Sequence, residues 1–241
     1  MAAPRRDLID LLRREGPPRL ELLTPAPVPA PRVVGLLSGS FDPPTVAHAA
    51  LASGLRDARC DLVLLVWSVR TLPKEAAPGG EPGPPLLDED ARLDCLLAMA
   101  AARPGVGLAL SSHGLIADQV EAAARRFPGA RLVVGMGSDK VLQLLDPRWY
   151  DDRSAALDRL TGLATVAYAP RAGEEEAVAE VLARSENAPW RGAFADLGLP
   201  PGVADVSSRE VRWRLRAGGD VSHLLPPEVA ESMGSLPRPE G

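Results

Sequence analysis

The residues of this chain whose types and spacing could do chemistry begin with residues 39–48, which read GSFDPPTVAH. An apolar run precedes this stretch and a segment with helical spacing follows it, so the stretch predicts a strand–turn–helix corner. Gly39 would let a ligand approach the backbone closely, and free N–H groups at the helix start favour phosphate. Thr45 and His48 share one helix face, where a hydroxyl and an imidazole N–H can both donate to phosphate oxygens. An ordinary corner with a surface histidine is the alternative that spacing alone leaves open.

A second candidate cluster lies near the C-terminus, where residues 206–212 read VSSREVR. Ser207 and Glu210 have the spacing of a capping box, which would satisfy a helix start without any ligand. Alternatively, the backbone N–H groups of this helix start, a spare hydroxyl and Arg212 would surround a triphosphate. Both interpretations can hold together.

These two stretches resemble a known family. Residues 39–48 are similar to the Gly-x-Phe-Asp-Pro-x-(His or Thr)-x-Gly-His motif of the nucleotidyltransferase superfamily with an HxGH-type motif, although position 47 is alanine. Residues 206–212 and 224–229 resemble the Ser-Ser-Thr-x-Ile-Arg and Leu-Leu-Pro-x-x-Val motifs of bacterial nicotinate-nucleotide adenylyltransferases. The resemblance implies catalytic roles for His48 and Thr45. It also implies contacts with ATP for Gly39, Ser40, Phe41, Ser207, Ser208 and Arg212.

Weaker matches lie between the two motifs. Residues 137–140 read GSDK and resemble a Gly-Ala-Asp-Asn segment, which implies that Asp139 faces the nucleoside of ATP. Lys74 resembles the lysine of the family's Pro-His-Lys loop, although the histidine is missing. The resemblance implies contacts with the acceptor for Lys74, Arg92, Trp149 and Arg171.

One segment departs from the family's pattern. Where the family has Ser-Tyr-Thr-x-Asp-Thr, which helps to hold the pyridine nucleotide, residues 114–119 read GLIADQ. The tyrosine and both threonines are absent, and His113, just before the segment, is a candidate substitute ligand for the acceptor. A solvated loop histidine is the alternative.

The elements that must position these residues alternate along the chain. Apolar runs predict strands at 33–38, 61–67, 106–110, 131–136, 163–168 and 203–206. Helical spacing predicts helices at 5–15, 45–58, 87–102, 118–127, 140–145, 174–184, 208–217 and 227–233. This alternation predicts an α/β fold: a Rossmann-like doubly wound parallel sheet with helices on both faces and a ligand beyond the carboxyl ends of its strands.

The chain is expected to divide into three parts. Residues 1–31 are a helix and a proline-rich extension outside the resemblance, residues 32–233 the nucleotidyltransferase domain, and residues 234–241 a tail. The proline-rich part cannot form a regular helix or a central strand, so we expect the extension to be dispensable for folding and activity.

Composition excludes several classes of function. The net charge of −5 argues against a general nucleic-acid surface, and no apolar run is long enough to predict a membrane span. The N-terminal residues do not read as a secretory signal, so a cytoplasmic location is expected. Cys60 and Cys95 are expected to be buried free thiols.

The resemblance implies adenylyl transfer from ATP to nicotinate or nicotinamide mononucleotide in NAD biosynthesis, with Mg²⁺ bound to the phosphates and no metal ligands from side chains. Two alternatives stay open. The same fold could serve another acceptor, such as phosphopantetheine or a polyol or choline phosphate. It could also bind nucleotides without catalysis, because a fold does not fix a function.

Overall fold

A computed structural model describes residues 2–24, 28–70, 85–200, 202–203 and 205–234 of this chain. The predicted acceptor contact Lys74, most of the Pro/Gly-rich loop around it and residues 235–241 of the predicted tail lie outside the described residues.

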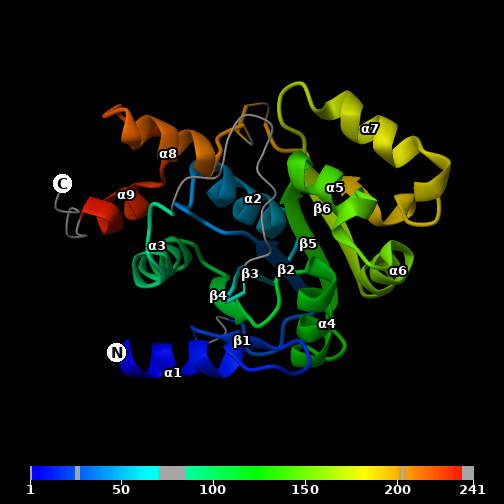
Figure 1. Ribbon diagram of the computed structural model, residues 1–241, viewed down its shortest axis with the longest axis horizontal. Helices are drawn as coiled ribbons and strands as arrows, with labels where there is room; N and C mark the ends of the chain where they lie inside the picture. Colours follow the sequence, from blue (N-terminus) through cyan, green and yellow to red (C-terminus); the bar gives the residue numbers. More distant parts are fainter. Residues whose placement is uncertain (1, 25–27, 71–84, 201, 204, 235–241) are drawn as a thin grey trace.

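Within these ranges, seven strands form one sheet in the order β1-β4-β3-β2-β5-β6-β7 (Figure 1). The strands are β1 (Leu20–Leu22), β2 (Val33–Ser38), β3 (Leu62–Ser68), β4 (Val106–Ser111), β5 (Arg131–Gly137), β6 (Ala164–Ala169) and β7 (Phe194–Asp196). All neighbours are parallel except β1, which lies antiparallel to β4 at one edge. The strand order reverses between β2 and β5, and such a switch point is where doubly wound sheets bind ligands. The predicted α/β, Rossmann-like class is confirmed.

Helices cover both faces of the sheet because successive strand residues point to opposite sides. In β3, Val63, Leu65 and Trp67 pack on one face, whereas the residues between them pack on the other. The first face is covered by α1 (Ala2–Arg13), α2 (Val46–Asp57), α3 (Glu89–Ala101), α8 (Ser208–Arg216) and α9 (Pro227–Gly234). The second face is covered by α4 (Ile116–Arg126), α5 (Ser138–Leu145), α6 (Arg153–Leu163) and α7 (Glu175–Ala183).

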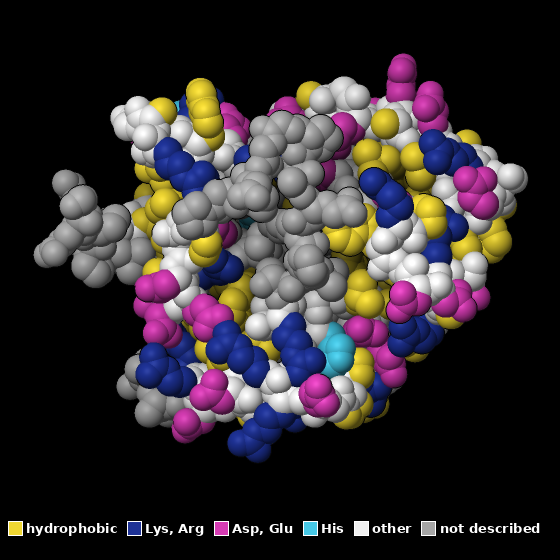
Figure 2. Space-filling model, viewed as in Figure 1, with side chains coloured by type: hydrophobic (Ala, Val, Ile, Leu, Met, Phe, Trp, Pro, Cys, Tyr) yellow, Lys and Arg dark blue, Asp and Glu magenta, His cyan; other side chains and the backbone are white. Residues whose placement is uncertain are grey.

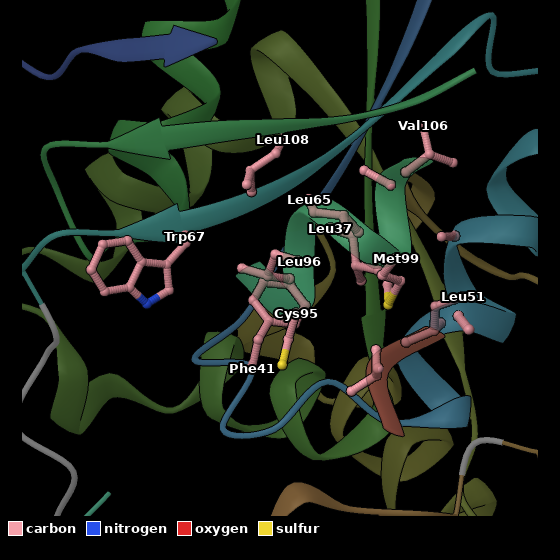
Figure 3. Packing of buried hydrophobic residues seen from close by; sticks show 14 of the residues in the cluster. Leu37, Phe41, Leu51, Leu65, Trp67, Cys95, Leu96, Met99, Val106 and Leu108 are labelled. Carbon is pink, nitrogen blue, oxygen red and sulfur yellow. The ribbon is translucent and has the colours of Figure 1, made fainter. Parts of the chain in front are cut away.

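The central helix α2 lies unusually close to the sheet. A Cβ added at Gly135 of β5 would come within 2.6 Å of the Leu55 side chain on α2, so only glycine fits there. Figure 3 shows that Phe41, just after β2, lies beside Cys95 and Leu96 of α3. Leu55 lies near the end of α2 and Phe41 lies just before its start, so close packing holds the helix near both ends.

Three elements, β1, α6 and β7, were missed by the sequence prediction, and one predicted strand was wrong. Helix α6 buries only Ala156, Leu157 and Leu160, too weak a pattern to stand out, although Asp152 caps its start by accepting the Ala155 N–H at 2.9 Å. Strand β7 is three residues long and pairs with β6 at the edge. The predicted strand at 203–206 is not one in its described residues, because β7 occupies the next position of the sheet.

The N-terminal segment is built into the fold. Ile9 and Leu12 of α1 are buried in the same apolar cluster as α3, and Arg5 donates to Asp94 at 2.9 Å. The proline-flanked strand β1 completes one edge of the sheet, a place where a strand tolerates prolines beside it. This packing argues against the expected dispensable extension, since deletion would expose apolar core and an edge. The domain boundary near residue 32 stays a prediction.

Charge is mixed over the surface. Figure 2 shows basic and acidic side chains interspersed on the face it presents, including the edge where α1 lies. Arg13 pairs there with Glu89. Both cysteines are buried and free, as predicted. None of the helices that the structure describes is both long and apolar enough to cross a membrane.

Candidate active site

A cavity of about 530 Å³ opens at the carboxyl ends of β2, β3 and β5, at the switch point of the sheet. Two walls face each other across it. The first, the α2–α8 wall, carries His48, Ser207, Ser208 and Arg212. The second, the α5 wall, carries Asp139, Lys140, Trp149, Tyr150 and Arg171. The two sequence motifs therefore meet at one cavity, although about 160 residues separate them.

The turn that opens the α2–α8 wall is shaped by Phe41. This residue is fully buried with a left-handed φ of 47°, and its ring centroid lies 5.0 Å from that of His48. A Cβ at Gly39 would come within 3.0 Å of the Phe41 ring. Gly39 is thus closely packed by the ring of Phe41, whereas the sequence suggested close approach of a ligand. Gly39 and Ser40 line the cavity, and Phe41 supports it from below.

His48 is oriented by the backbone of the same turn. Its Nδ1 accepts the Thr45 N–H at 3.0 Å, one half of a capping box. Because Nδ1 accepts a hydrogen bond, the neutral ring carries its own hydrogen on Nε2. Desolvation, with the positive charges of Lys140 and Arg171, lowers the pKa of His48 to about 3. The half-buried ring is therefore an uncharged donor at neutral pH in the free protein.

Thr45 differs from its predicted role. It is fully buried, and its hydroxyl lies 2.8 Å from His48 Nδ1 and 3.5 Å from the Val206 carbonyl. Thr45 is not among the described residues that line the cavity. Thr45 therefore orients His48 and ties α2 to the segment before α8, rather than donating to a phosphate itself.

A buried carboxylate joins the two motifs beneath the cavity. Asp42 accepts the backbone N–H groups of Leu86 and Leu87, the latter at 2.9 Å, and lies 3.6 Å from Arg92 and 3.5 Å from Arg212. Arg212 also donates to the Asp42 carbonyl at 2.6 Å. Arg92, predicted to bind the acceptor, is outside the cavity lining and donates to Leu87 instead. Its role in the structure is to compensate the charge of Asp42.

The start of α8 uses its two serines differently. Ser207 caps the helix by accepting the Glu210 N–H at 3.1 Å, and Glu210 pairs with Arg214 rather than closing a capping box. The Ser208 hydroxyl donates to the Pro43 carbonyl at 2.8 Å. The predicted spare hydroxyl is thus not that of Ser208, whose proton is committed, but that of Ser207, whose proton stays available to a ligand.

The α5 wall follows β5 and β6. Gly137 ends β5, and a Cβ there would come within 2.8 Å of an Asp139 carboxylate oxygen. Asp139 lies 3.5 Å from Arg171, which follows β6. The short 3-10 turn Pro147–Trp149 brings Trp149 to the cavity, as the resemblance implied. Desolvation raises the pKa of Tyr150 to about 12, so its phenol stays protonated and donates to the Leu144 carbonyl.

The segment at residues 114–119, which departs from the family's pattern, also reaches the cavity. Gly114, Leu115 and Ile116 line it at the start of α4. Buried Gln119 holds this loop by donating to the His113 carbonyl at 3.0 Å. His113 itself binds the Ser112 hydroxyl and is not among the lining residues, so it is not placed as a substitute ligand.

Sequence reasoning gave no role to several lining residues, of which some stand outside any motif and others stand beside the assigned positions of one. They are Trp67, Arg70, Gln119, Lys140, Tyr150, Glu174 and Arg209. Trp67 stands at the carboxyl end of β3 (Figure 3), and its indole nitrogen has no hydrogen-bond partner within the described ranges. Only the strand ends themselves, once paired in a sheet, could have revealed these residues.

Metal-binding side chains do not gather in groups of three or more among the described residues. The carboxylates lining the cavity already have partners, because Asp139 faces Arg171 and Glu174 accepts from Ser138. A hard cation would therefore have to come with the oxygens of a ligand.

Comparisons with known proteins find relatives over most of the chain. No protein-family model matches the chain. A curated protein of Gemmatimonas aurantiaca, named probable nicotinate-nucleotide adenylyltransferase, is 31% identical over 209 residues, covering 84% of this chain and 90% of the relative. A protein of the same name from Laribacter hongkongensis is 33% identical over 214 residues, covering 81% and 90%.

Solved structures are similar in fold. The Plasmodium falciparum nicotinic acid mononucleotide adenylyltransferase complexed with NaAD has a TM-score of 0.59 and 14% identity, covering 84% of this chain and 94% of that one. The same enzyme complexed with APC has a TM-score of 0.57 and 13% identity, with the same coverage. At that identity the likeness supports the fold alone.

Proposed function

Because the chain belongs to the nicotinate-nucleotide adenylyltransferase family, we propose that it transfers the adenylyl group of ATP to the phosphate of a pyridine mononucleotide in NAD biosynthesis. The observation that carries this proposal is the α2–α8 wall. An uncharged imidazole with its N–H on Nε2, a free Ser207 proton and the start of α8 face one cavity at the switch point of the sheet.

The reaction needs no side-chain nucleophile. An oxygen of the acceptor phosphate attacks the α-phosphorus of ATP, the bond from that phosphorus to the β-phosphate oxygen breaks, and pyrophosphate leaves with the electron pair. The protein's contribution is to align the two phosphates and to stabilise charge that develops between them. His48 Nε2 would donate to the transferred phosphate, and Thr45 would hold the ring in that tautomer.

ATP would lie along the α2–α8 wall. Gly39 and Ser40 would contact its phosphates from the first turn, and Ser207 with the α8 N–H groups would hold the leaving β- and γ-phosphates. Arg212 would add charge there, held in place by Asp42. Asp139 would face the nucleoside, as the resemblance implies. Phe41 and Ser208 support this wall through packing and through the bond to Pro43.

Magnesium would accompany the triphosphate. Since Asp139 and Glu174 are already engaged, the ion would bind chiefly phosphate oxygens and water, and it would supply neutralisation of their charge.

The acceptor would lie toward the α5 wall. Trp149 offers an aromatic face for the pyridine ring, and Arg171 offers a cation. Lys74 remains a proposed contact outside the described residues. Arg92 and His113 are left out of this site because they do not line the cavity.

Pyrophosphate release tests the proposal. ATP or CTP would be combined with nicotinate mononucleotide, nicotinamide mononucleotide, phosphopantetheine, choline phosphate and a polyol phosphate, and products identified by mass. We expect turnover only with ATP and a pyridine mononucleotide. Turnover with another acceptor alone would indicate the second class of enzyme, and tight ATP binding without release for any acceptor would indicate a nucleotide-binding protein.

A further inference from the structure

Lys140 has an uncompensated charge inside the cavity. It is the third residue of α5, which starts directly after β5 at the switch point, and it lines the cavity opposite the α2–α8 wall. Among the residues that the structure describes, its ammonium group forms no hydrogen bond and no ion pair. The adjacent carboxylate of Asp139 lies against Arg171 instead, at 3.5 Å.

This position is unfavourable for a lysine in the free protein. The N-terminus of a helix carries partial positive charge, which disfavours a cation there. Desolvation and the charge of Arg171 lower the pKa of Lys140, and only Asp139 opposes them. Packing does not account for the residue either, since its charged end faces the cavity rather than an acidic partner. A bound anion would remove each of these penalties.

The residues around the cavity indicate which anion Lys140 would bind. Lys140 and Arg171 both lower the pKa of His48, so their fields reach the ring whose Nε2 faces the cavity. The leaving phosphates already have Ser207, Arg212 and the start of α8 on the opposite wall. In that arrangement the transferred phosphate would lie between the two walls, with His48 as its donor from the α2–α8 wall.

We propose that Lys140 is a catalytic residue that binds the non-bridging oxygens of the transferred α-phosphate, opposite His48. The inference rests on the proposed adenylyl transfer and deepens it. As the acceptor oxygen bonds to the α-phosphorus and the bond to pyrophosphate breaks, negative charge gathers on these oxygens, and the ammonium group stabilises it. Lys140 stays protonated throughout, so no proton is transferred.

A binding experiment tests the contact without turnover. Lys74 and Lys140 are the only lysines in the chain, so reductive ¹³C-methylation, which keeps the charge, gives two lysine signals that Lys74→Arg assigns. AMP and ATP, each without acceptor, should shift the Lys140 signal and raise its pKa, whereas pyrophosphate should not. No shift at a concentration where calorimetry shows ATP bound overturns the proposal, and so does a shift with pyrophosphate alone.

Kinetics separate a catalytic from a structural role. Lys140→Gln should lower kcat about 10²-fold with KM for ATP changed less than threefold, because the contact strengthens in the transition state. Lys140→Arg should recover part of that loss. Melting temperature should stay equal or rise in Lys140→Gln, since an unpaired cation is removed. Arg184→Gln, which removes an exposed cation on α7's end, is the matched control and should behave as wild type.

Unchanged kcat in Lys140→Gln, or a fall in melting temperature that matches the loss of activity, would overturn the assignment. If wild-type protein released no pyrophosphate with any acceptor, the proposed function would fail, while the AMP and pyrophosphate titrations would still decide the contact.

Discussion

The two walls of the cavity are built in different ways. On the α2–α8 wall, the polar groups are tied to one another by hydrogen bonds between distant segments, such as Ser208 to Pro43 and Arg212 to Asp42. On the α5 wall, Lys140 has no hydrogen-bond or ion-pair partner among the described residues, and the Arg171 side chain lies 3.5 Å from Asp139. The first wall is preorganised before any ligand binds, and the second gains its main partners only from the ligand.

The largest effect should come from breaking the preorganised wall at its base. Asp42→Ala removes a buried carboxylate and leaves Arg92 and Arg212 unpaired, so unfolding free energy should fall by about 3–5 kcal/mol. Pyrophosphate release should be lost with it. Chemical denaturation measures the first effect, and Asp57→Ala, an exposed site at the end of α2, should leave stability unchanged. Equal stability in both variants would mean that the two motifs are held together by other contacts.

Removal of the His48 donor should have the second largest effect on activity. His48→Ala should lower kcat about 10²–10³-fold, the scale for one preorganised donor to developing charge. Because His48 is half-buried and accepts the Thr45 N–H, stability should also fall by about 0.5–2 kcal/mol, the usual loss for a cap. His223→Ala, at an exposed histidine, is the control. Activity within threefold of wild type would remove His48 from the mechanism.

The sequence predicted the α2–α8 wall better than the α5 wall. The turn before α2 and the start of α8 stand in motifs, so their convergence on one cavity could be predicted, as could the parallel sheet that brings them there. The fate of individual hydroxyls and charges could not. Thr45, Ser208 and Arg92 are engaged by Val206, Pro43 and Asp42, and these partners are distant in sequence or known only once the chain has folded.

The α5 wall was harder to predict because its residues become functional only through tertiary placement. Trp67 is a single residue in an apolar run, and Lys140 stands where the resembling segment has asparagine, so neither residue type suggested a role. Their relevance depends on which strand ends are neighbours, and this follows from the order β3-β2-β5 rather than from the order in the chain.

A smaller effect is expected where the acceptor would bind, in the preference between the two mononucleotides. Gly114, Leu115 and Ile116 bring no side-chain donors to the cavity, and the N-cap residue Leu115 forms no capping bond, which leaves backbone N–H groups of α4. Nicotinate should therefore be preferred over nicotinamide only by about 10- to 150-fold, the value of one hydrogen bond to a charged group. Steady-state kcat/KM for both mononucleotides on one preparation measures this ratio.

Trp149→Phe provides the matched variant for that measurement. A ring that stacks on the pyridine serves both mononucleotides alike, so kcat/KM should fall for both while their ratio stays the same. A nicotinate preference above about 10³-fold in wild type would exceed what one such hydrogen bond supplies, and would mean that a charged or multiple donor binds the carboxylate.

The smallest expected effect is the change of unfolding free energy with pH. The pKa of His48 is about 3 in the folded protein and 6.5 as a reference value, so between these pH values the unfolded chain binds a proton that the folded protein excludes. The resulting stability is complete above pH 6.5 and is lost as pH falls toward 3. The non-titrating variant His48→Asn lacks this dependence, whereas all other groups titrate alike in both proteins and cancel in the difference. From pH 7 to 5.5, wild type should therefore lose about 0.5–1 kcal/mol of unfolding free energy relative to the variant, the upper end being reduced because the ring is partly exposed. Denaturant titrations of both proteins at the two pH values measure it. Parallel losses would mean that His48 has the same pKa in the folded and unfolded states, and the imidazole on the α2–α8 wall would then become cationic as pH falls through 6.5.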